Sequence, residues 1–86
     1  MTASRVARIR TRLETALAPE KLEVIDESHL HVGHAGARDG RGHFRIRIGS
    51  ARFAGKSRLA RHRMIYDALN DMMDHDIHAL AIEEDS

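Results

Sequence analysis

The side chains best suited to metal chemistry in this 86-residue chain are its seven histidines, which no cysteine accompanies. Imidazole is the commonest metal ligand among neutral side chains, and it titrates closest to physiological pH. Because the chain has no thiol, soft-metal or redox chemistry must use imidazole nitrogen or sulfur supplied by another molecule. The histidines fall in three places: a glycine-rich segment (His29, His31, His34 and His43), an Arg-His-Arg triplet (His62) and the region near the C-terminus (His75 and His78).

The histidines differ in the structure that their neighbours predict. Segment 29–42 has four glycines and no hydrophobic periodicity, which predicts a long hairpin loop of the kind that is often functional. Its imidazoles could converge on a metal ion, although three histidines from one loop make a weak site. We expect His62 to lie on the buried stripe of a helix as a core histidine. His78 alternates with Leu80 and Ile82, so we expect it to point toward the same sheet face, near its rim.

Charge divides the chain into two parts. Residues 1–63 contain all 14 Lys and Arg beside six acids, 14 − 6 = +8, whereas residues 64–86 contain seven acids and no base, −7. This asymmetry indicates either contact with nucleic acid or mutual neutralisation of the two parts in the folded protein. The basic positions that could bind phosphates cluster after residue 44 and include Lys56, Arg58, Arg61 and Arg63. Arg61 and Arg63 could also simply pair with Asp26 and Glu27.

Hydrophobic spacing predicts five elements. Helical spacing over 6–17 ends before Pro19, and strand-like alternation follows at 21–26 and again at 43–48. Ser57 is a plausible N-cap for one long helix reaching about residue 73, with Leu59, His62, Tyr66, Leu69 and Met73 as its buried stripe. A short apolar strand at 77–82 follows. The order helix-strand-strand-helix-strand predicts a two-layer α+β sandwich, with both helices on one face of a three-stranded sheet.

Several classes of protein are not expected. Residues 1–86 make a single domain, and nothing around its serines resembles a nucleophile elbow, so we expect no enzymatic activity. No apolar run approaches the roughly 18 residues of a membrane helix. The arginines near the N-terminus precede no apolar stretch of a secretory signal, and the absence of cysteine fits a reducing compartment. We therefore expect a cytoplasmic protein without a membrane partner.

Separated motifs in order resemble the BolA family over nearly the whole chain. They are Leu-Glu-Val-Ile-Asp-Glu-Ser at 22–28, His31, His-Phe at 43–44, Arg-Phe-Ala-Gly-Lys-Ser at 52–57, Arg-His-Arg-Met-Ile-Tyr at 61–66 and Ile-His-Ala-Leu-Ala-Ile at 77–82. The resemblance implies a fold like a class II KH domain, with a mixed sheet. The G-x-x-G loop with which KH domains clamp nucleic acid is absent, since Arg58 lies three residues after Gly55.

The resemblance also implies a function. Members of this family partner monothiol glutaredoxins and share a [2Fe–2S] cluster with the glutaredoxin and its glutathione, in iron–sulfur maturation and iron sensing. The C-terminal ligand of the family corresponds to His78 and its loop ligand to His31, with His34 as the alternative. No cofactor would be tightly bound to the isolated chain, which would be a monomer or a weak homodimer. The alternative function is a DNA-binding regulator of stress response and morphology; a zinc- or nickel-binding histidine module is a third.

Overall fold

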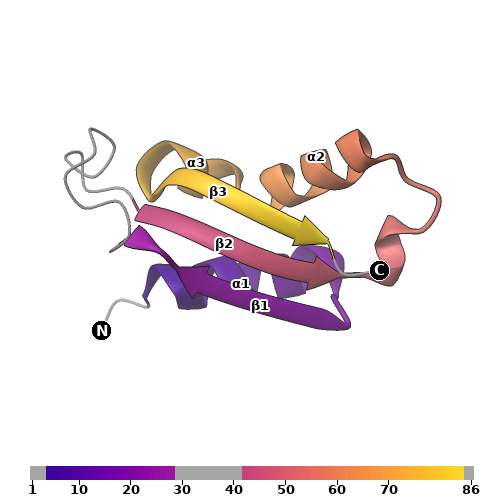
Figure 1. Ribbon diagram of the computed structural model, residues 1–86, viewed down its shortest axis with the longest axis horizontal. Coiled ribbons are helices and arrows are strands. Elements are labelled where there is room, and N and C mark those ends of the chain that lie inside the picture. Colours follow the sequence, from indigo (N-terminus) through magenta and orange to yellow (C-terminus); the bar gives the residue numbers. More distant parts are fainter. Residues whose placement is uncertain (1–3, 29–41, 85–86) are drawn as a thin grey trace.

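A computed structural model describes residues 4–28 and 42–84 of the chain. The described elements, in order, are helix α1 (Arg5–Leu17), strands β1 (Lys21–Asp26) and β2 (Gly42–Gly49), the short 3-10 helix η3 (Ala51–Phe53), helices α2 (Arg58–Ala68) and α3 (Asn70–His75), and strand β3 (Ile77–Glu84). Figure 1 shows the helices α1, α2 and α3 on one side of the sheet. This is the two-layer arrangement that the sequence predicted.

The sheet is mixed, as expected, with the order β1-β2-β3. β1 pairs with β2 antiparallel and β2 pairs with β3 parallel, so β2 is central. The alternation of β2 places Phe44, Ile46 and Ile48 toward the helices, where each is at most 2% exposed. Ile9 and Leu13 of α1 are fully buried against them. The predicted core of β2 and α1 is confirmed.

Serine side chains define where the helices begin and end. Ser4 caps α1 and Ser57 caps α2, each accepting a hydrogen bond of 3.1 Å from the backbone N–H three residues later. At the end of α1, Ser50 Oγ donates to the Leu17 carbonyl at 2.6 Å, and Arg52 donates to the carbonyl of Ala16. These bonds satisfy carbonyls that the helix leaves without partners and tie α1 to the turn after β2. The predicted cap at Ser57 is confirmed.

The expected single helix from Ser57 to about Met73 is wrong in one respect. Leu69, at φ −106° and ψ 14°, separates α2 from α3. Its N–H reaches the carbonyl of Tyr66, and its own carbonyl accepts from Met72, so the chain winds more tightly there. The tighter winding brings Leu69 and Met72 into the core together with Ile65, all at most 1% exposed.

The predicted buried stripe of this helix is also wrong, because a different face of the helix is buried. Leu59 is 62% exposed and Tyr66 39% exposed, whereas Ile65, which we had placed on the flank, is fully buried. His62 is only partly buried and contributes nothing to the core cluster. Leu69 belongs to both stripes, which is why the sequence alone did not separate them. None of the described helices is long and apolar enough to cross a membrane.

Candidate functional site

Some of the predicted site residues lie within the described part of the chain and others do not. His31 and His34, like His29, lie outside the described residues. His78 is exposed on β3, and His75 is exposed at the end of α3. Within residues 4–28 and 42–84, no group of three His, Cys, Asp or Glu side chains is arranged to hold a metal ion. The described chain therefore offers at most part of a ligand set.

The structure brings His78 together with His43, a pairing that the sequence did not predict. Their ring centres lie 5.1 Å apart and the ring planes are tilted by 51°. His43 is 8% exposed, while His78 is exposed. The pair thus combines one imidazole held within the protein with one that a partner molecule can reach.

An irregularity in strand pairing creates this contact. Gly42 pairs with Ile77, but the next residue, His43, pairs with Ala79, which leaves His78 as an extra residue in β3. Ile77 is 1% exposed, and Leu80 packs against the core, so both point toward the helices. The expectation that His78 shares a face with Leu80 and Ile82 is therefore wrong. A bulge of this kind re-aims a side chain, and here it brings the ring of His78 to that of His43.

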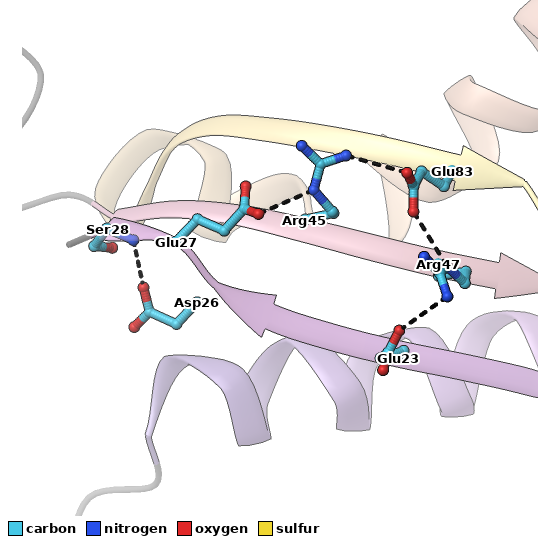
Figure 2. Close-up of polar contacts among 7 residues, drawn as sticks. All are labelled: Glu23, Asp26, Glu27, Ser28, Arg45, Arg47 and Glu83. Carbon is cyan, nitrogen blue, oxygen red and sulfur yellow. Dashed lines mark hydrogen bonds and ion pairs between the residues drawn. The ribbon is translucent and has the colours of Figure 1, made fainter. Parts of the chain in front are cut away.

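The Asp-Glu-Ser motif fixes the backbone of His43. Ser28 Oγ accepts a 3.0 Å hydrogen bond from the N–H of His43, and the N–H of Glu27 donates to its carbonyl at 2.8 Å. Asp26 holds Ser28 in turn, because its carboxylate accepts from the Ser28 N–H at 2.9 Å (Figure 2). A glycine fits at position 42 beside them without any shift, whereas a Cβ there would lie 2.6 Å from the ring of Phe44, so a neighbour would have to move. The motif therefore holds one histidine of the pair in place.

Ion pairs with helix α1 hold the chain segment that leads into β3 and His78. The Asp76 carboxylate accepts hydrogen bonds from Arg8 at 2.8 and 3.2 Å and from Arg5 at 3.3 Å. The hydrogen bonds from Arg8, assisted by the one from Arg5, lower the pKa of Asp76 below its ordinary value. The carbonyl of Asp76 accepts from the N–H of Gly42 at 2.9 Å. One residue thus joins α1, the start of β2 and the start of β3.

A ladder of alternating charges covers the open face of the sheet (Figure 2). Arg45 bonds to Glu27 at 3.0 Å and to Glu83 at 3.2 Å. Arg47 reaches Glu83 at 3.1 Å and Glu23 at 3.6 Å. The pKa of Arg45 is raised, chiefly by its hydrogen bond to Glu27. Both arginines of the central strand therefore pair with acids: Glu23 in β1, Glu27 just after it, and Glu83 in β3. This face is consequently not a free basic surface for phosphates.

The remaining basic candidates separate into two kinds. Arg61 donates to the carboxylate of Glu84, which lowers the pKa of Glu84, and Nε2 of His62 lies 3.5 Å from the same carboxylate. The expected pairing of Arg61 with Asp26 or Glu27 is therefore wrong. By contrast, the other three candidates, Lys56, Arg58 and Arg63, are exposed and make no ion pair with another described residue.

These contacts show that the basic and the acidic part of the chain pair with each other in the folded protein. Arginines of the basic part pair with acids of the acidic part at Asp71, Asp76, Glu83 and Glu84. Mutual neutralisation therefore accounts for much of the asymmetry. It leaves Lys56, Arg58 and Arg63, just before and along α2, exposed without ion pairs among the described residues.

Sequence reasoning missed His43 and Asp76 as residues that build the site. The signal for His43 was its place beside Phe44 at the start of a strand, opposite the core. That signal does not show which residue of β3 lies next to it, because the bulge is a property of strand pairing. Asp76 gave no local signal, since its partners Arg5 and Arg8 are about 70 positions away in sequence.

Comparison with known proteins identifies the family to which the chain is similar. The family model for BolA-like protein matches residues 13–85. The chain is 53% identical over 77 residues to an uncharacterised Sinorhizobium protein and 43% identical over 75 residues to the DNA-binding transcriptional regulator BolA of Escherichia coli. Each alignment covers 87% of this chain, and they cover 83% and 69% of the relatives respectively.

The solved structures add the fold. The BolA domain of SufE1 from Arabidopsis thaliana superposes with a TM-score of 0.82 at 45% identity, covering 98% of this chain and 93% of that one. The chain spans 23% of the SufE-like protein 1 from Arabidopsis thaliana, so it corresponds to one part of that relative. The order of the elements, the mixed sheet and the matched residues together show that this chain belongs to the BolA-like family.

Proposed function

We propose that this chain is a non-enzymatic adaptor that binds a monothiol glutaredoxin and shares a [2Fe–2S] cluster with it, in iron–sulfur maturation or iron homeostasis in the cytoplasm. The observation that carries the proposal is the exposed imidazole of His78, held beside His43 at one end of the sheet. The ligand from β3 is His78. The ligand from the loop is His31, with His34 as the alternative.

The chemistry of the donor set fits a shared cluster. The sequence holds no thiol, so this chain cannot hold an all-thiolate cluster, whereas imidazole is an accepted ligand for one iron of a [2Fe–2S] centre. The glutaredoxin and glutathione would supply the thiolates. Mixed imidazole and thiolate ligation raises the reduction potential above that of an all-thiolate cluster.

The residues of this chain have defined tasks in the proposal. His78 presents an imidazole to the partner, and the backbone bonds from Ser28 and Glu27 hold His43 rigidly behind it. Asp76, the residue just before β3, is held to α1 by its hydrogen bond from Arg8. These contacts order the backbone on either side of His78, so less of it has to be ordered when a partner binds, which favours affinity.

Co-expression with a monothiol glutaredoxin tests the proposal. We expect the chain to co-purify with the glutaredoxin, with glutathione and with iron and sulfide in a 1:1 ratio. His78→Ala should retain less iron in the complex, whereas His75→Ala, at an exposed histidine three residues away, should retain as much as the unchanged chain. Equal iron retention by both variants would contradict the role given to His78. Absence of any complex would contradict the adaptor function itself.

A second candidate function rests on the surface at the start of α2. Lys56, Arg58 and Arg63 are exposed there without ion pairs among the described residues, and Tyr66, expected in the core, is 39% exposed on the same helix. This surface could bind DNA phosphates, and the E. coli relative is named a DNA-binding transcriptional regulator. Arg61 is excluded from this set because it pairs with Glu84.

Salt dependence tests the second candidate. With three phosphate contacts, log K for duplex DNA should fall with log salt at a slope of about −2.7. The double variant Arg58→Ala, Arg63→Ala should lower that slope to about −0.9, while Arg47→Ala, on the sheet face, should leave it unchanged. Affinity that does not respond to Arg58→Ala, Arg63→Ala would rule out this surface.

A further inference from the structure

The pair formed by His43 and His78 has a geometry that suits a single metal ion. A nitrogen ligand lies about 2.0–2.1 Å from zinc and its ring centre roughly 1 Å farther, so two imidazoles on one tetrahedral ion have centres about 5 Å apart. The observed separation of 5.1 Å matches this value. The tilt of 51° between the ring planes is neither the parallel nor the perpendicular arrangement that aromatic pairs prefer.

The charged side chain beside the pair on β2 already has partners of its own. Arg45, the next residue of β2 on the same face, is tied to Glu27 and Glu83. No third His, Cys, Asp or Glu among the described residues completes a ligand set there. An ion held by the two imidazoles would therefore keep coordination positions for water or for a ligand from solution, as open metal sites do.

We infer that His43 and His78 form a two-imidazole site that binds one divalent transition ion, such as Zn²⁺ or Ni²⁺, in the isolated chain. Imidazole suits both ions, and a site made of imidazoles without carboxylates disfavours Mg²⁺ and Ca²⁺. The site requires neither glutaredoxin nor DNA, so it goes beyond the proposed function. It assigns a ligand role to His43, whose neighbours Ser28 and Glu27 hold its backbone in place.

Zinc and nickel titrations of the isolated chain test this inference. To remove other imidazoles, the titrations use a background in which His29, His31 and His34 are changed to Ala. We expect one equivalent of Zn²⁺ to bind, and either His43→Ala or His78→Ala to weaken binding at least tenfold. The double variant should bind little worse than either single variant, because both residues serve one ion. His75→Ala is the matched control and should change nothing.

A second measurement does not depend on the folding of His43→Ala. In the background that lacks His29, His31 and His34 but keeps His43, paramagnetic Ni²⁺ should broaden the backbone NMR signals of residues 42–44 and 77–79 at the lowest metal concentrations. Broadening that begins elsewhere in the background lacking His29, His31 and His34, or a His43→Ala variant that binds Zn²⁺ as tightly as His75→Ala, would overturn the inference. Neither outcome bears on cluster sharing with a glutaredoxin, which is measured separately.

Discussion

The carboxylate of Asp76 offers the sharpest test of how the fold supports His78. Asp76→Asn keeps the shape of the side chain but removes its charge. The wild-type carboxylate accepts two hydrogen bonds from Arg8 and one from Arg5, and it is only 17% exposed. Hydrogen bonds to charged groups contribute about 1.5–3 kcal/mol each when buried. Because both arginines are more than one-third exposed, solvent reduces these values considerably.

We therefore expect Asp76→Asn to lower the free energy of unfolding by about 2–3 kcal/mol at pH 7, a smaller amount than the sum of three buried bonds. In a domain of this size, that change lowers Tm by roughly 10–20 °C. Urea denaturation followed by far-ultraviolet circular dichroism measures it. Asp71→Asn is the matched control, since Asp71 pairs with Arg12 but is 64% exposed, and it should cost at most about 0.5 kcal/mol.

The pH dependence of the same pair of proteins gives an independent check. The pKa of Asp76 is lower in the folded chain than in the unfolded chain, chiefly because of Arg8. Its stabilising contribution is therefore complete above the unfolded pKa of about 3.9 and disappears as the pH falls through the folded pKa. The difference between wild type and Asp76→Asn should shrink as the pH is lowered from about 5. A difference below about 0.5 kcal/mol at pH 7, or one independent of pH, would refute this reasoning.

Three further predictions concern the core and the site. Leu69→Ala should cost about 3 kcal/mol in urea denaturation and Leu59→Ala less than about 0.5 kcal/mol, since Leu69 is fully buried and Leu59 is 62% exposed; similar costs would contradict the helix phase. Ser28→Ala should cost about 1–2 kcal/mol and speed amide hydrogen exchange at His43, whose N–H loses its acceptor; unchanged exchange would contradict this role. Gly42→Ala should destabilise by about 1–3 kcal/mol, because its Cβ would lie 2.8 Å from the hydroxyl of Ser28; a stability equal to wild type would show that the neighbours yield easily.

The sequence predicted those parts of the fold that local patterns determine. The alternation of β2 identified Phe44, Ile46 and Ile48 as core, and the serine before Arg58 identified the start of α2. Which face of α2 is buried could not be predicted in the same way. Leu69 lies at helical spacing from Leu59 and Tyr66 on one face, and equally from Ile65 on another. Packing selected Ile65, and the tight turn at Leu69 then redirected the chain into α3.

The candidate site was predictable only in part. The resemblance to a family singled out His78, but its contact with His43 depends on one extra residue in the pairing of β2 with β3. The same limit applies to the arginines. Their number indicated a basic surface, yet the register of the sheet places Glu23, Glu27 and Glu83 beside Arg45 and Arg47. Contacts of this kind, between residues far apart in the sequence, cannot be predicted from local sequence patterns.

In the proposed function, His78 becomes a ligand when a glutaredoxin shares its cluster with this chain. Visible circular dichroism tests it most directly, during titration of the apo chain into a cluster-loaded monothiol glutaredoxin with glutathione. We expect a new spectrum that saturates at one chain per glutaredoxin. His78→Ala should give a different spectrum or none, while His75→Ala should reproduce the new one. A spectrum that the wild-type chain leaves unchanged, or that His78→Ala alters in the same way as wild type, would contradict it.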